Sequence, residues 1–410
     1  MIRIRIRNFG PIKDGYQKND GWLDVTKVTV FIGNQGSGKS TVAKLISAFM
    51  WLEKAILRGD IHSPVSNKRL IEVLAFHRLQ NYLQPNSEIA YEGTSLKLRL
   101  TGTQPGKQTV DVETKKSKTV RLPKIMYVPA ERNFLSSIEN INTVSNLIVG
   151  SLRNYSIEFR NAQLAHKGKK VDLPINDNTT VFYDPKEDEN YLLIGNKRLK
   201  LTEASSGFHS IVPLYWVTKY LAEFVKQREK KLLQLLSADQ AVRRNNELKE
   251  LNLSELDEKS IRSKEKKINE KYVCKYFVNI VEEPEQNLFP TSQQLLLNSL
   301  LEFNNGGNML IMTTHSPYLI NYLTLAVEAH KLKSRVNTDS LKNQLSEIVP
   351  LSATVDYSSL VIYELNETDG SIEKLKNFHG LPSDENYLNE RLADSNDSFS
   401  KLLDIEDQCQ

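Results

Sequence analysis

The feature that most constrains this chain is the glycine-rich run from Gly33 to Ser40, which matches the pattern G-x-x-x-x-G-K-[ST]. A strand-like run, Val25 to Ile32, precedes it, and apolar residues at helical spacing follow it until Gly59. Glycines let successive backbone N–H groups turn toward one anion, and the following helix points its positive end at the same place. The context therefore predicts a phosphate-binding loop rather than a turn that merely caps a helix.

Residue roles follow from this motif. Lys39 is expected to neutralise β- and γ-phosphate oxygens, the Ser40 hydroxyl to ligate Mg²⁺, and Thr41 to lie near the α-phosphate. The expected cofactors are ATP and Mg²⁺. The remaining nucleotide contacts are expected from Asn34, Gly36, Ser37 and Gly38.

A second cluster follows a continuous apolar run, Tyr276 to Val281, that suits a buried parallel strand. Phosphoryl transfer needs a metal partner and a group that orients water, and both commonly follow such a strand. We expect Glu282 to be the acid linked to Mg²⁺ and Glu283 to be the base that polarises water. Acids after a strand are also common turn material, but the phosphate loop upstream favours the catalytic interpretation.

Two further segments each have two interpretations. His315 follows the apolar strand Met309 to Thr313, so it is either a structural histidine or a side chain that reaches the γ-phosphate. Ser205, Ser206 and Gly207 open a helix whose apolar stripe continues to about residue 236. They either cap that helix or offer their amides as a second anion site.

Composition excludes several classes of protein. Lys plus Arg number 54 against 50 Asp plus Glu, so the net charge gives no strong argument for nucleic acid or an anionic membrane. The two cysteines, Cys274 and Cys409, are too few for a disulfide framework or a cysteine-rich zinc module. No stretch approaches the roughly 18 apolar residues that a membrane helix needs. We expect a globular, cytoplasmic protein that is neither exported nor embedded in a membrane.

The order of the motifs resembles the ATP-binding-cassette (ABC) superfamily, and within it the soluble SMC-like and OLD-like AAA family ATPases. The chain is similar to the ATPase subunits of bacterial antiphage systems of the Septu and PARIS type. The segments that carry this resemblance are IRIRIRNFGPI, PAERN, ASSGFHS, EEPEQNLFP and TTHSP. They lie within residues 1–50, 122–134, 190–220 and 276–320.

The resemblance implies an α/β fold of the ABC ATPase-head type: a mixed sheet flanked by helices, an antiparallel β subdomain and helical insertions. We expect the head over residues 1–222 and 272–365, with a helical insertion at 134–175. Residues 223–271, dense in Lys, Arg and Glu, predict a charged helical insert that is either a solvated face or an arm for a partner. Residues 366–410 are expected to pack on the head or extend it.

The family also implies a function. Its signature segment, here Ser205 to Gly207, closes over ATP held by another subunit, so a homo-oligomer with composite sites is expected. The resemblance implies a sensor or regulatory ATPase of antiphage defence that controls a separate effector protein such as a nuclease, with DNA or a phage protein as a possible trigger. The alternatives are an SMC-like DNA-repair or DNA-binding head and a self-contained OLD-type nuclease.

Three positions depart from the family pattern. Glu282 replaces the usual Asp, and Phe208 stands where Gln or Glu is common. No Gln follows the predicted strand Lys124 to Val128, where the family places its glutamine loop, and Glu131 and Arg132 occupy that region. These two residues either sense the γ-phosphate or form a structural salt bridge.

Overall fold

The computed structural model describes residues 2–102, 104, 106–115, 121–138, 147–176, 178–227, 229–251 and 257–408. The strands of its three larger sheets are β1 (Ile2–Arg7), β2 (Gly15–Tyr16), β3 (Leu23–Val25), β4 (Val28–Gly33), β5 (Glu88–Glu92), β6 (Leu96–Thr101), β7 (Thr109–Thr114), β8 (Leu122–Val128), β9 (Val171–Asp172), β10 (Thr179–Asp184), β11 (Glu189–Ile194), β12 (Lys197–Lys200), β13 (Cys274–Glu282), β14 (Met309–Thr313), β15 (Leu360–Leu365) and β16 (Ser371–Lys374). A small hairpin pairs β17 (Asn377–Phe378) with β18 (Leu381–Pro382).

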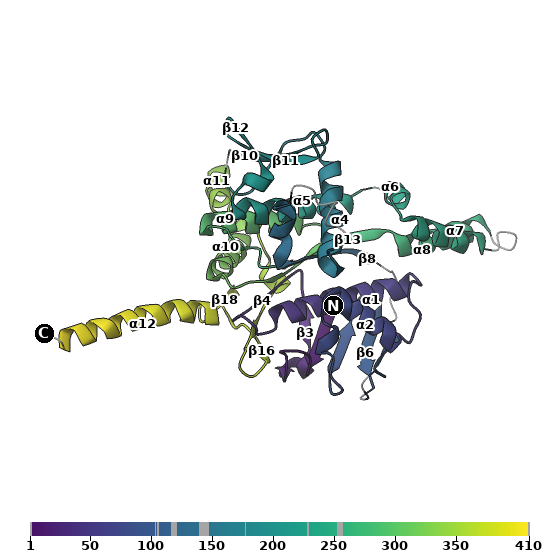
Figure 1. Cartoon of the computed structure of the whole chain (residues 1–410), viewed down its shortest axis with the longest axis horizontal. Helices are drawn as coiled ribbons and strands as arrows, with labels where there is room; N and C mark the ends of the chain where they lie inside the picture. The colour runs from purple at the N-terminus through teal and green to yellow at the C-terminus, as the bar shows by residue number, and fades with distance from the viewer. Residues whose placement is uncertain are drawn as a thin grey trace.

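The helices run between and around these sheets (Figure 1). They are α1 (Lys39–Leu57), α2 (Asn67–Phe76), α4 (Gly150–Ala165), α5 (Ser206–Phe224), α6 (Glu229–Gln234), α7 (Ala238–Lys249), α8 (Glu258–Tyr272), α9 (Pro290–Phe303), α10 (Pro317–Lys333), α11 (Asp339–Ile348) and α12 (Tyr387–Gln408).

A seven-stranded mixed sheet forms the centre, in the order β2-β16-β15-β4-β14-β13-β8. The five strands from β15 to β8 are parallel to one another, so their carboxyl ends lie at one edge. β4, β13 and β14 carry the continuous apolar runs that a sheet covered on both faces requires. This edge is therefore where the segments after β4, β13 and β14 meet.

Alternate residues of β4 point into two separate cores. Val28, Val30 and Ile32 pack with α4, α5, α9 and α10, whereas Phe31 packs with α1 and the antiparallel sheet β3-β1-β5-β6-β7. A third sheet, β12-β11-β10-β9, adjoins the first of these cores. The predicted α/β fold, a mixed sheet flanked by helices with an antiparallel β subdomain, is confirmed.

The structure of the segments predicted as helical insertions differs in detail from what their sequence patterns predict. The helix α4 ends at Ala165, and residues 171–172 belong to a strand because Val171 pairs with Val181; part of this segment, 139–146, lies outside the described residues. The helices α6, α7 and α8 lie within residues 229–251 and 257–272 and project from one side of the body, while α12 projects from the other (Figure 1). In the described part of the chain, no helix is long and apolar enough to cross a membrane.

Candidate functional site

The loop between β4 and α1 has the backbone that its glycines predict. Gly33 and Gly38 have φ of 138° and 100°, a region that side chains disfavour. A Cβ on Gly33 would lie 2.2 Å from the Leu365 carbonyl oxygen, and one on Gly38 would lie 2.9 Å from Ile12 Cδ1. Gly38 is the N-cap of α1 and supplies no side-chain cap, so the first amides of α1 stay available to an anion.

Lys39 lies at the first position of α1 and is 5% exposed. Its Nζ donates to the carbonyl oxygens of Gly33 at 2.9 Å and Asn34 at 2.8 Å. An ammonium has three donors, so one remains for another acceptor. Burial lowers the pKa of Lys39 to about 8, and the negative charges of Glu283, Glu285 and Glu367 limit the decrease. Lys39 is therefore mostly protonated at neutral pH.

Glu282 ends β13 and is 3% exposed. Its Oε2 accepts a hydrogen bond of 3.1 Å from the Ala130 N–H, and its Oε1 lies 3.6 Å from the ammonium of Lys44, on the same face of α1 as Ser40. Within the described residues, Oε1 accepts no hydrogen bond although it is buried. One carboxylate oxygen is thus anchored by a hydrogen bond, and the other has an ion pair with Lys44 but no hydrogen bond among the described residues.

Glu283 and His315 form a pair at the carboxyl end of the sheet. The Glu283 N–H donates to the Thr313 carbonyl oxygen at 2.9 Å, and its Oε1 lies 3.4 Å from His315 Nε2. The hydrogen bond with His315 holds the pKa of Glu283 below its usual range, with burial opposing and the charge of Lys39 adding to the effect. Glu283 is therefore a carboxylate beside the Lys39 ammonium, with roughly a third of its side chain exposed.

Glu285 fixes the segment that carries His315. Its Oε1 accepts hydrogen bonds from the His315 N–H at 2.7 Å and the Thr314 hydroxyl at 2.8 Å. Burial raises the pKa of Glu285, and these hydrogen bonds oppose the increase. The structure thus brings Lys39, Glu283 and His315 together, as the order of the strands requires.

Ser205, Ser206 and Gly207 lie at the start of α5. Both serines are exposed, and Ser205 is an N-cap whose side chain makes no capping hydrogen bond. Gly207 packs on the loop after β13, where a Cβ would lie 3.0 Å from the Asn287 carbonyl oxygen. Without a side-chain cap, the first amides of α5 lack the partner that a capping side chain would supply.

Glu367 is a site residue that the sequence did not predict. Its Oε1 accepts a 2.8 Å hydrogen bond from Asn34 Nδ2, and its charge acts on Lys39. It lies in the turn after β15, whose last residue, Leu365, pairs with Gly33. The register of β15 beside β4 places this turn over the phosphate loop.

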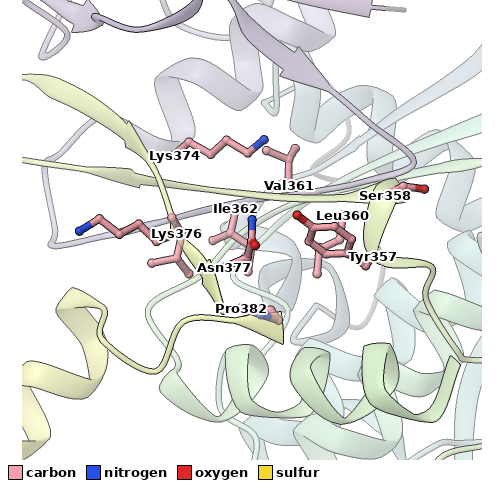
Figure 2. A pocket seen from close by; sticks show the side chains of 10 residues that line it. Tyr357, Ser358, Leu360, Val361, Ile362, Lys374, Lys376, Asn377 and Pro382 are labelled. Carbon is pink, nitrogen blue, oxygen red and sulfur yellow. The ribbon is translucent and has the colours of Figure 1, made fainter. Parts of the chain in front are cut away.

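Cavities of the described residues lie away from this site. One of about 120 Å³, shown in Figure 2, is formed by β15, β16 and the turns around them, including Tyr357, Ile362 and Pro382. A larger one of about 420 Å³ lies between α1, α2, β8 and α4. Neither is lined by a predicted site residue. Within the same described ranges, no three His, Cys, Asp or Glu side chains are grouped to hold a metal ion.

No protein-family model and no curated protein matches the sequence. Solved structures do match. An SMC head bound to the C-winged helix domain of ScpA aligns with 91% of this chain and 95% of its own, at 9% identity and a TM-score of 0.40. The SMC head domain from Thermotoga maritima aligns with 92% and 98%, at 10% identity and a TM-score of 0.39.

An ATP-binding cassette in a dimeric post-hydrolysis state with ADP and Pi aligns with 92% of this chain and 100% of its own, at 11% identity and a TM-score of 0.29. These likenesses are too distant to transfer the role of any residue to this chain.

Proposed function

We propose that this chain binds and hydrolyses ATP as an ABC-type ATPase. The observation that carries the proposal is the position of the Lys39 ammonium. It lies at the uncapped start of α1, with one donor free, beside a carboxylate that is paired with His315. A cation, free amides and a deprotonated carboxylate at one strand edge are the parts that phosphoryl transfer to water uses.

The triphosphate would lie over the loop, because the groups that bind phosphate are available there. The first amides of α1 have no side-chain cap, and Lys39 keeps its third donor. The Ser37 hydroxyl is 1% exposed and has no hydrogen-bond partner among the described residues. A buried hydroxyl without a partner costs free energy, and an anion in the loop would restore its hydrogen bond.

Ser40 and Glu282 are the residues that would hold Mg²⁺. The buried Glu282 Oε1, without a hydrogen bond, fits an interaction with the ion or with one of its waters. When bound, Mg²⁺ supplies neutralisation of the charge on the β- and γ-phosphate oxygens. Two protein ligands suffice, because Mg²⁺ commonly keeps several waters and phosphate oxygens.

Glu283 would orient the attacking water and accept its proton. The carboxylate is held by His315, and the strand-like hydrogen bond to Thr313 fixes its backbone. His315 in turn is fixed through its own N–H by Glu285, and in this proposal its side chain would contact the γ-phosphate.

We further propose a homo-oligomer in which Ser205, Ser206 and Gly207 of one subunit close over ATP on another. Their exposure at the uncapped start of α5 supports this. In this proposal the chain is a cytoplasmic regulatory subunit of an antiphage complex. Its ATP state controls a separate effector such as a nuclease, and DNA or a phage protein is the trigger. Co-purification of an effector with the tagged chain, released or retained according to the nucleotide, tests this role.

Two variants test the ATPase itself. Lys39→Ala should lower ATP affinity by at least tenfold (about 1.4 kcal/mol), because it removes the cation that attracts phosphate. Glu283→Gln should keep ATP affinity within about threefold and reduce kcat roughly 10²- to 10³-fold, since it removes only the base. Calorimetric titration with ATP and a phosphate-release assay measure the two effects. Glu72→Gln, an exposed carboxylate of α2, is the matched control and should change neither. Unchanged ATP affinity in Lys39→Ala would refute the proposal.

A further inference from the structure

Arg132 is a charged side chain that is completely buried. It lies in the short 3-10 helix Ala130–Ser136, which follows β8, and it is 0% exposed. A buried guanidinium is tolerated only where its donors are satisfied, because loss of hydration costs several kcal/mol. Its partners therefore indicate what it does.

The acceptors of Arg132 are main-chain carbonyl oxygens. Nη1 donates to Glu282 at 2.7 Å, and Nη2 donates to Glu283 at 2.6 Å. Nε donates to Ser210 at 3.2 Å, and a longer contact of 3.4 Å joins Nη1 to Pro129. With no exposed surface and these donors engaged, the guanidinium fixes backbone and does not reach a phosphate. The sequence left two roles open for Glu131 and Arg132, sensing the γ-phosphate or forming a structural salt bridge. The contacts of Arg132 are structural, but among the described residues its partners are carbonyl oxygens and not a carboxylate.

The backbone that Arg132 holds at Glu283 is strained. Glu283 has φ of 44°, in the left-handed region that costs a non-glycine residue about 1–2 kcal/mol. Such a conformation persists when the surroundings over-determine it. The Thr313 carbonyl takes the N–H of Glu283, and Arg132 takes its carbonyl oxygen. This conformation sets the direction in which the Glu283 side chain leaves the strand, toward His315.

The third contact of Arg132 leads to the signature helix. Ser210 lies one turn after Ser206 in α5, and its hydroxyl accepts a 3.0 Å hydrogen bond from Asn287 Nδ2. The guanidinium therefore links α5, near its start, to the end of β13 by hydrogen bonds. One rigid planar group joins the segment that would contact a second subunit's ATP to the segment that carries the base.

We propose that Arg132 is a positioning residue for Glu283: it holds the strained peptide of Glu283 and makes the position of that carboxylate depend on where α5 begins. The proposal rests on the proposed ATPase function. Arg132 contacts neither nucleotide nor metal in this arrangement, so its loss should reduce turnover and leave ATP binding intact. Misplacing a catalytic group by about 1 Å is enough to cost roughly 10²-fold in rate.

The test compares three variants by ATP affinity, KM and kcat. Arg132→Met should keep ATP affinity within about threefold and lower kcat roughly 10²-fold. Arg132→Lys should fall between Arg132→Met and wild type, because an ammonium can bond only some of the four carbonyls. Arg160→Met is the matched control: this arginine bonds Tyr183 and Asp188, between α4 and the third sheet, so its loss should leave kcat unchanged.

A second measurement separates positioning from general loss of structure. Arg132→Ala creates a hole that a guanidinium ion fits, so low millimolar guanidinium chloride should restore part of its kcat, and methylammonium should restore less. An Arg132→Met protein with the kcat of an active wild type would overturn the inference. A parallel fall of ATP affinity and kcat in Arg132→Met would also overturn it. A folded Arg132→Ala protein whose kcat does not rise with guanidinium would overturn it as well. An inactive wild type would instead contradict the proposed ATPase and this inference together.

Discussion

Two buried basic side chains, Lys39 and His77, respond differently to burial. Burial lowers the pKa of Lys39 only to about 8, because nearby carboxylates oppose the decrease. His77 is 3% exposed, its ring packs edge-on against Tyr127, and the cation Lys44 acts on it. Burial, with Lys44 adding to it, lowers the pKa of His77 to about 3. His77 is therefore neutral in the folded protein, and Lys44 is left free to pair with Glu282.

This burial predicts sensitivity to acid. Unfolded His77 has a pKa near 6.5, so unfolding takes up a proton between about pH 6.5 and pH 3, and stability falls as the pH falls through that range. By pH 4.5, protonation of this one group on unfolding has lowered the free energy of unfolding by about 2–3 kcal/mol. His77→Phe should remove that part of the loss, as measured by urea unfolding at pH 7.5 and 4.5. His62→Phe, at an exposed position, is the control. Equal acid sensitivity of wild type and His77→Phe would contradict the assignment.

The positions of single residues were predictable where the pattern is local in sequence. Lys39 and Ser40 lie at the start of a helix after the glycine loop, and Glu283 follows a buried strand, whereas their roles in ATP hydrolysis stay predictions. The contacts of Arg132 and Glu367 could not be predicted from the sequence in this way. A buried arginine has the same sequence signal as an exposed one, and Glu367 lies in what reads as an ordinary polar turn. Their roles depend on partners 150 and 333 residues away, Glu282 and Asn34.

Among the elements, α1 links the phosphate loop to the antiparallel sheet through one carboxylate. Glu53 is 6% exposed on the face of α1 that packs on this sheet. It accepts hydrogen bonds from the N–H groups of Ser95 and Leu96, at 2.7 and 3.0 Å, and from the Tyr91 hydroxyl at 2.9 Å. The side chain of Glu53 in α1 is therefore the hydrogen-bond acceptor for the buried amides at the turn between β5 and β6.

Removing this acceptor should destabilise the protein. Glu53→Ala leaves the N–H groups of Ser95 and Leu96 buried without an acceptor, so it should cost about 2–4 kcal/mol. Glu53→Gln keeps one oxygen and should cost about half as much. Glu72→Ala, which removes an exposed ion pair with Arg69, should stay within about 0.5 kcal/mol. Thermal and urea unfolding measure all three, and an equal effect of Glu53→Ala and Glu72→Ala would contradict the anchoring role.

Strands were predictable where apolar and polar residues alternate or where apolar residues form a continuous run. The ends of helices were less predictable. The sequence pattern places β14 at the bounds that the structure has, because it is a short apolar run. The helix that opens at Ser206 was expected to reach residue 236, but α5 ends at Phe224 and a separate helix holds Leu232. Leu232 is 5% exposed, so its side chain is buried although it lies on a separate helix and not on a continuation of α5. A stripe of buried residues therefore does not reveal the break between them.

For the whole molecule, the open phosphate loop and the exposed start of α5 predict sites shared between subunits. Lys39→Ala and Ser205→Arg should each abolish most turnover alone, because one removes the phosphate cation and the other blocks the facing signature. A mixture should regain activity, with at most one intact site in each mixed pair. ATPase assays on proteins mixed at varying ratios measure this. Full activity of Ser205→Arg alone would refute the shared site, and Ser237→Arg, at the start of α7, is the control.

The strand that leads into the phosphate loop has both of its neighbours late in the chain. Val28 of β4 lies beside Leu310 of β14 on one side and Leu360 of β15 on the other. Pairings across such separations form only after the intervening chain exists. During synthesis, the loop after β4 must wait for residues 310 to 313 and 360 to 365 to leave the ribosome before its backbone is held on both sides. Under the proposed function, a growing chain would therefore gain its phosphate site only after β15 has been made.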